Sequence, residues 1–96
     1  MAESPPSGWS YRLSPDQELR TRRPDRVEPA LQVLLVQSGR AFAPGHPTTR
    51  LCLDLLRETL APGPVPRLAD VGCGAGVLSL AAAALGVHRV VGVDIA

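Results

Sequence analysis

The feature of this sequence that most constrains its fold is a glycine-rich turn between two short apolar segments. The stretch Asp70–Gly76 reads D-V-G-C-G-A-G and overlaps the end of the apolar segment Arg67–Val71. Val77–Leu85, rich in Ala and Leu, and the apolar segment His88–Asp94 follow it. Strong helix formers after the turn predict a helix, and Gly86 supplies its C-terminal stop. A strand, a helix and a strand in this order predict a parallel β-α-β unit with a right-handed crossover.

The turn and an acid beyond it predict a crevice of the Rossmann type. Glycines there adopt tight backbone conformations and let a flat cofactor approach the chain closely. The helix that starts at Val77 adds free backbone N–H groups beside the turn. Asp94, at the tip of the second strand, follows Gly72 by twenty-two residues. That distance is close to the ~20 residues expected for an acid that binds a ribose diol.

The spacing of the glycines separates two kinds of cofactor. The dinucleotide fingerprint G-x-G-x-x-G would need a glycine at position 77, but that residue is Val77 and the third glycine is Gly76. Asp70, two residues before the first glycine, would repel a pyrophosphate and suits a cationic amino-acid group. This favours S-adenosylmethionine over NAD(P), and an NAD(P)-binding oxidoreductase fragment is the alternative. The predicted cofactor-binding residues of the turn and strand tip are Asp70, Gly72, Gly74, Gly76 and Asp94.

The segments before the turn predict a strand and a helix. Ala30–Gln37 is short, apolar and bounded by proline and glycine, which favours a strand. The helix would begin with Thr48 or Thr49 as its N-cap and end at Ala61, before Pro62. Its expected buried face comprises Leu51, Cys52, Leu55, Leu56 and Leu60, and its expected solvated positions are Arg50, Asp54, Arg57 and Glu58.

The N-terminal part, residues 1–29, is interpreted as a flexible segment or linker. Residues 1–8 are small, polar and proline-rich, and Trp9–Pro29 is charged and interrupted by prolines. The arginines at 20, 22, 23 and 26 are offset by nearby acids and are taken as a solvated loop. The fold class predicted for residues 30–96 is α/β, the first half of a Rossmann-like domain that is truncated at its C-terminal side.

Composition excludes several partners. A net charge of +1 gives no electrostatic case for nucleic acid or for an anionic membrane surface. Cys52 and Cys73 lack metal-ligand spacing and are read as reduced thiols, and His46 has no clustered partner for a metal or an acid-base role. The N-terminus has no signal-peptide core, and the longest apolar run is shorter than the about 20 residues that span a bilayer. The protein is therefore expected in the cytoplasm, without a metal.

These motifs resemble those of the class I methyltransferases, which carry an acid followed by G-x-G-x-G and a second acid after strand two. Within that class, Ala41–Thr49, A-F-A-P-G-H-P-T-T, is similar to the pattern A-F-G-T-G-x-H-P-T-T of the methyltransferases that modify a stalk protein of the large ribosomal subunit. The present stretch is one residue shorter and has Ala43-Pro44 where the family has Gly-Thr. The resemblance covers Leu31–Ala96.

The resemblance implies an enzyme that transfers methyl groups from S-adenosylmethionine to amino groups of a ribosomal protein. It implies cofactor contacts from Thr49, Gly72 and Asp94, whereas no residue is assigned as a catalytic base. A further cofactor contact of the family, an Asn after strand four, would lie beyond Ala96. We therefore expect the 96 residues alone to be inactive, and a non-catalytic remnant that needs a partner is a further alternative. The family's substrate-recognition domain would precede this region, with only its tail or a linker in Trp9–Glu28.

Overall fold

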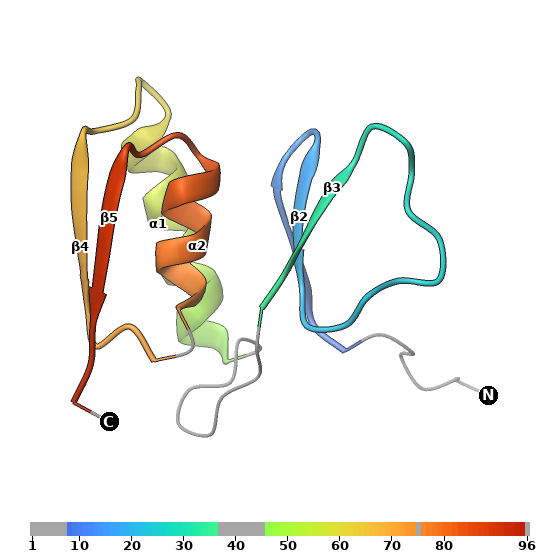
Figure 1. Ribbon diagram of the computed structural model, residues 1–96, viewed down its shortest axis with the longest axis horizontal. Coiled ribbons are helices and arrows are strands. Elements are labelled where there is room, and N and C mark those ends of the chain that lie inside the picture. The colour runs from blue at the N-terminus through green and yellow to red at the C-terminus, as the bar shows by residue number, and fades with distance from the viewer. Residues whose placement is uncertain (1–7, 37–45, 75, 96) are drawn as a thin grey trace.

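The computed structural model describes residues 8–36, 46–74 and 76–95. Two helices lie between two small sheets, as Figure 1 shows. The first sheet contains β1 (Ser10–Ser14), β2 (Gln17–Arg20) and β3 (Gln32–Leu35), and the second contains β4 (Arg67–Val71) and β5 (Arg89–Val93). The helices are α1 (Pro47–Leu60) and α2 (Val77–Ala84).

The predicted β-α-β unit is present. β4 and β5 pair in parallel, from Arg67 opposite Arg89 to Val71 opposite Val93, and α2 connects them. α2 ends at Ala84, one residue earlier than expected, and Gly86 follows with a φ of 102°. The α/β fold class, with a partial Rossmann-like arrangement, is therefore confirmed.

The N-terminal segment contains a β-hairpin that the sequence interpretation missed. β1 and β2 pair antiparallel, with Tyr11 opposite Leu19, across the turn formed by Pro15 and Asp16. Along β1 the side chains of Tyr11 and Leu13 are buried and Arg12 is exposed, which is the alternation of a half-buried strand. The loop prediction is wrong for this stretch because Pro15 lies in the turn and interrupts neither strand.

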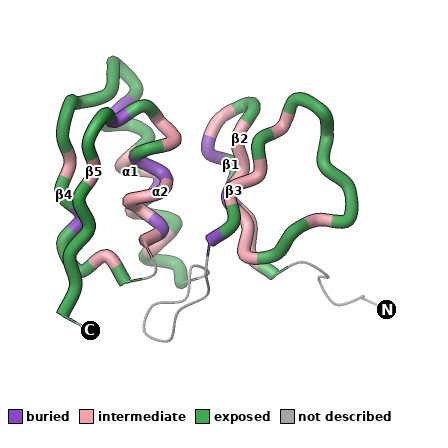
Figure 2. Tube along the Cα trace, in the orientation of Figure 1, coloured by how far each residue is buried: buried purple, intermediate pink, exposed green. Residues whose placement is uncertain are grey.

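The strand predicted at residues 30–37 is present as β3, and it belongs to the same sheet as the hairpin. β3 pairs in parallel with β2, from Gln17 opposite Gln32 to Arg20 opposite Leu35, and not with β4. Two apolar clusters hold the layers together, visible as buried purple segments in Figure 2. The first joins the hairpin sheet to both helices, and the second joins both helices to β4 and β5. The division of the chain at residue 29 stays a prediction, and the β2–β3 pairing crosses it.

The buried face of α1 differs from the predicted one. Leu53 is fully buried and Leu60 is 6% exposed, whereas Leu51 and Leu55 are each 62% exposed. The prediction that Leu51 and Leu55 are buried is therefore wrong. Apolar residues surround most of this helix, so periodicity alone does not select a face. The missed hairpin selects it, because its buried side chains Tyr11, Leu13 and Leu19 pack in the same cluster as Leu53.

The N-terminus of α1 is capped by His46. Its side chain Nδ1 accepts a hydrogen bond of 3.1 Å from the backbone N–H of Thr48, and Pro47 occupies the first turn. The expected caps, Thr48 and Thr49, are therefore wrong, because Pro47 takes the first helical position and His46, the residue before it, becomes the cap. This gives His46 a structural role and places both threonines inside the first turn of the helix.

Tyr11 joins the hairpin to α1 through polar contacts. Its hydroxyl donates a hydrogen bond of 2.5 Å to Asp54 Oδ1, and the guanidinium groups of Arg50 and Arg57 lie 5.1 Å and 5.8 Å from the centre of its ring. Trp9 stacks on the same ring at 6.2 Å. Asp54 is therefore half-buried and hydrogen-bonded to Tyr11, although it was predicted to be a solvated position.

The burial of Tyr11 and its contact with Asp54 should raise the pKa of the Tyr11 hydroxyl. Burial raises the pKa of Tyr11 above its ordinary 10.0, and the hydrogen bond to Asp54 raises it further. A pKa that is higher in the folded state gives stability that is fully present below the unfolded value and lost as pH rises through the folded value. We expect the phenolate absorbance of the folded protein to titrate above pH 10.0, and Tyr11 is the only tyrosine that contributes.

The control for this titration is Tyr11→Phe. Over the same pH range the free energy of unfolding of the wild type should fall more than that of the variant. A phenolate midpoint at or below 10.0 would contradict burial of Tyr11 against α1.

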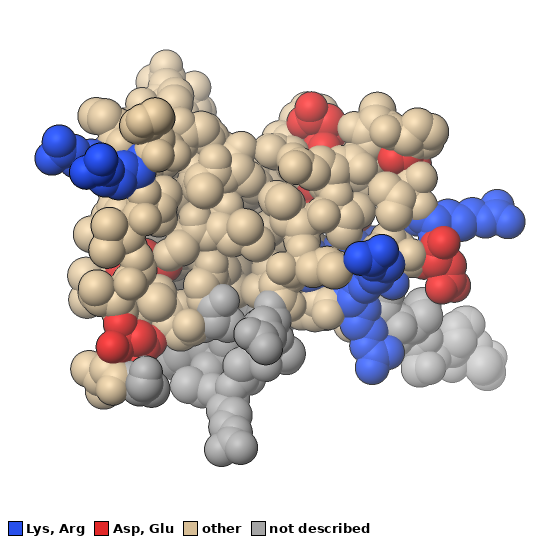
Figure 3. Space-filling model, viewed as in Figure 1, with Lys and Arg blue, Asp and Glu red and all other residues tan. Residues whose placement is uncertain are grey.

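Charged side chains lie mainly at the margins of the face seen in Figure 3, and its centre is uncharged. Outside the grey residues, this face carries no continuous basic patch of the kind that binds nucleic acid. None of the helices in the described ranges is long and apolar enough to cross a membrane.

Candidate cofactor site

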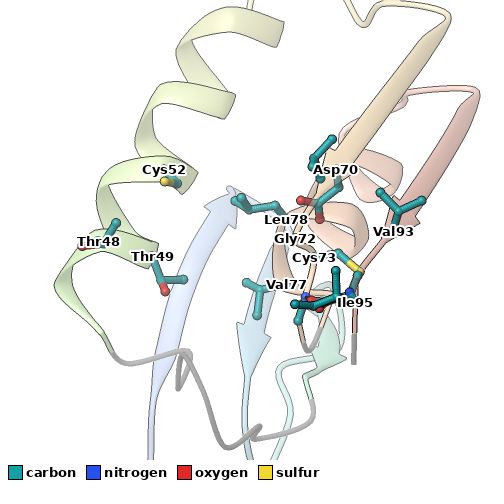
Figure 4. Close-up of a pocket in the computed structure, with 13 residues that line it drawn as sticks. Thr48, Thr49, Cys52, Asp70, Gly72, Cys73, Val77, Leu78, Val93 and Ile95 are labelled. Atoms are coloured by element: carbon teal, nitrogen blue, oxygen red, sulfur yellow. Dashed lines mark hydrogen bonds between the residues drawn. The ribbon is translucent and has the colours of Figure 1, made fainter.

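A cavity of about 640 Å³ opens where β4 and β5 end and α1 begins. Its volume is in the range of about 300–1,000 Å³ that is typical of small-molecule sites. Five of the six predicted site residues line it: Thr49, Asp70, Gly72, Gly74 and Asp94. Figure 4 shows Thr49 on α1 across the cavity from Asp70 and Gly72. Gly76 does not line the cavity, and it is instead the left-handed N-cap of α2 with a φ of 83°. The remaining lining is mostly apolar, from Val71, Val77, Leu78, Val93 and Ile95.

The glycine turn is fastened to the end of β5. The backbone N–H groups of Gly72 and Cys73 both donate to the carbonyl of Val93, at 2.7 Å and 3.0 Å. The N–H of Gly74 donates to Asp94 Oδ2 at 2.6 Å. These bonds bring the turn and the strand tip together, although they lie about twenty residues apart in sequence.

Backbone conformation explains why the turn needs glycine. Gly72 and Gly74 have φ values of 72° and 54°, in the left-handed region that L side chains rarely adopt. A Cβ built on either residue would meet no atom within 4 Å. The requirement in this structure is therefore for positive φ, and steric room is not the reason.

Asp94 is exposed at the rim of the cavity. Its Oδ1 accepts a hydrogen bond of 2.7 Å from the N–H of Ile95, while Oδ2 holds the turn through Gly74. Its exposed position at the rim makes the carboxylate accessible to hydroxyl donors of a ligand. Asp94 therefore has two roles open to it, one in shaping the turn and one toward a ligand.

Asp70 is the buried acid of the site, at 8% exposure. Its Oδ2 accepts a hydrogen bond of 2.7 Å from the hydroxyl of Ser79 on α2. Within residues 8–36, 46–74 and 76–95, Asp70 makes no ion pair with a cationic side chain. A buried carboxylate is costly without a compensating charge or several hydrogen bonds. The wall of the cavity therefore favours a positively charged ligand group.

The sequence interpretation missed Ser79. The feature that could have identified it is that Ser79 is the one polar side chain in the helix V-L-S-L-A-A-A-A. Cys52 and Cys73 also line the cavity, where both are free and half-buried, although Cys52 was expected in the core. In the described part of the chain no three potential metal ligands cluster together. The first part of the predicted loop motif, residues 41–45, lies outside the described residues.

A parallel β-α-β unit whose glycine turn and second-strand acid line one cavity is typical of Rossmann-like domains that bind nucleoside cofactors. Comparison with known proteins narrows the class. Residues 18–96 match the family model described as ribosomal protein L11 methyltransferase (PrmA). The chain therefore belongs to the PrmA family, and the oxidoreductase alternative is not supported.

Individual relatives agree with this assignment. The ribosomal protein L11 methyltransferase of Geobacter sulfurreducens is 44% identical over 96 aligned residues, which cover 93% of this chain and 31% of the relative. The protein of the same name from Ralstonia pickettii is 47% identical over 72 residues, 74% of this chain and 24% of the relative. The chain thus spans about a third or less of the length of these relatives. No solved structure gives a significant match.

Proposed function

We propose that this chain carries the S-adenosylmethionine site of a methyltransferase that modifies amino groups of a ribosomal protein. The observation that carries the proposal is the single cavity that Asp70, the glycine turn and Asp94 line together. The family supports the reaction class, since its members that resemble this chain are named ribosomal protein L11 methyltransferase. The same names support a ribosomal protein as the methyl acceptor and hence a cytoplasmic location.

The residues present fit the parts of this cofactor. Asp70, buried and without a cationic partner in the described residues, suits the ammonium group of the methionine end. Asp94, exposed at the rim, suits the ribose diol because a carboxylate accepts hydrogen bonds from hydroxyl groups. Thr49, in the first turn of α1, lies across the cavity and would contribute its hydroxyl. The apolar lining suits the adenine ring and the carbon chain.

The contribution of these residues to the reaction is binding and orientation. S-adenosylmethionine would supply a methyl group bonded to a positively charged sulfur. The neutral thioether that remains after the transfer is a good leaving group. The chain's own task is to hold the cofactor by both ends, so that the methyl group faces the acceptor in one orientation. Aligning two reactants in this way can lower a barrier by roughly 7–11 kcal/mol in favourable cases.

Cofactor preference tests the proposal. In a complete methyltransferase domain that carries this sequence, we expect S-adenosylmethionine and S-adenosylhomocysteine to bind in isothermal titration calorimetry and NAD not to bind. The reason is the glycine register, which ends at Gly76, together with a buried acid that repels a pyrophosphate. Tighter binding of NAD than of S-adenosylhomocysteine would overturn the assignment of the cavity.

A further inference from the structure

Ser79 stands behind the cavity wall and contacts its buried acid. It is the third residue of α2, it is half-buried, and its hydroxyl donates to Asp70 Oδ2 at 2.7 Å. A serine in a helix commonly bonds the carbonyl one turn earlier in its own helix. Here its hydroxyl instead reaches across to β4, so the contact joins the helix to the site.

The neighbouring strand leaves room for this contact. Gly92 on β5 is the register partner of Asp70 in the parallel sheet. A Cβ built on Gly92 would lie 3.1 Å from Ser79 Oγ and 3.1 Å from Cys73 Sγ, closer than nine in ten real Cβ contacts. Any larger residue at position 92 would push Ser79 or Cys73 aside. A glycine on a strand thus keeps the serine against the acid.

The contact fixes one oxygen of Asp70 and leaves the other available. Ser79 is the hydrogen-bond partner of the Asp70 side chain among the described residues, and it holds Oδ2. A neutral hydroxyl orients a carboxylate without neutralising it, so the negative charge of Asp70 remains for a ligand. An Asp70 side chain without this restraint could rotate about its Cα–Cβ and Cβ–Cγ bonds and would lose its fixed direction.

We propose that Ser79 is a positioning residue that holds the Asp70 carboxylate for the ammonium group of the cofactor. The proposal rests on the proposed function, because it needs S-adenosylmethionine or its product in this cavity. It assigns Ser79 to the amino-acid end of the cofactor and not to the adenosine end. Two ligands separate these ends, since 5′-methylthioadenosine has the adenosine group but lacks the ammonium and carboxylate groups of S-adenosylhomocysteine.

The experiment compares Ser79→Ala with the wild type by calorimetry, using both ligands and the same complete domain that carries this sequence. We expect S-adenosylhomocysteine to bind about threefold to tenfold more weakly to the variant, the range for losing one ordinary hydrogen bond, because Ser79 acts on the ligand only through Asp70. The affinity for 5′-methylthioadenosine should stay within about twofold of the wild type. Thr59→Ala is the matched control, because its hydroxyl bonds the Leu55 carbonyl on α1 and does not line the cavity. It should change neither affinity.

Each other outcome is decisive. An equal loss for both ligands would assign Ser79 to the general packing of the site and overturn the positioning role. Unchanged binding of S-adenosylhomocysteine to Ser79→Ala would overturn it as well, while leaving the cofactor site intact. Failure of the wild type to bind S-adenosylhomocysteine would instead reject the proposed function itself.

Discussion

Replacing Leu53 by alanine is expected to lower the free energy of unfolding by about 2–5 kcal/mol, the range for a fully buried leucine. Leu53 has no exposed surface, and it packs in the cluster that joins the hairpin sheet to α1 and α2. Truncation would leave a cavity between the hairpin sheet and the two helices. A loss of this size is a large fraction of the stability of a small domain.

The matched control for Leu53 is Leu55→Ala on the same helix. Leu55 is 62% exposed, so its replacement should change the free energy of unfolding by no more than about 0.5 kcal/mol. Denaturant unfolding of the two variants, followed by circular dichroism, measures both effects. The reverse order, with Leu55→Ala the more damaging change, would restore the buried face that periodicity alone predicted and would contradict the packing of α1 on the hairpin.

The same comparison shows where sequence reasoning about the fold succeeded and failed. The β-α-β unit was predictable because its glycine turn, its helix formers and its apolar strands all indicate one arrangement. The face of α1 was not, because its leucines spread over a wide arc of the helix and tertiary contacts decide which of them are buried. The hairpin was missed because arginines and prolines suggested a solvated loop. The alternation of apolar Tyr11 and Leu13 with charged Arg12 is the pattern that could have predicted a strand there.

The candidate site was predictable to a greater extent than the fold around it. The residues that line it from β4, the turn and β5 are close in sequence or are placed by a known spacing, so the motif is enough to bring them together. The motif could not predict the residues that contact these lining residues from behind and hold them in place. Ser79 and Gly92 matter through contacts across two elements, and the cap of α1 by His46 depends on where Pro47 starts the helix.

Removing the carboxylate of Asp94 should weaken cofactor binding by about tenfold to a hundredfold. Two hydrogen bonds from ribose hydroxyls to a carboxylate are charge-assisted and together contribute roughly 1.5–3 kcal/mol after desolvation. Asp94 is exposed at the tip of β5, so Asp94→Ala should leave the fold largely intact. Calorimetry with S-adenosylhomocysteine measures the change, and Asp25→Ala, which removes an exposed acid outside the cavity, is the control.

Asp94 also holds the N–H of Gly74, so a weaker affinity could arise from a loosened turn as well as from lost ribose contacts. A 2′,3′-dideoxy analogue of S-adenosylhomocysteine separates the two causes, because it has no diol. If Asp94 binds the ribose, the wild type should bind the analogue about as weakly as Asp94→Ala binds the normal ligand, and the variant should lose little further affinity for the analogue. An equal loss for both ligands in Asp94→Ala would assign its effect to the turn. An unchanged dissociation constant in a folded variant would remove Asp94 from the site.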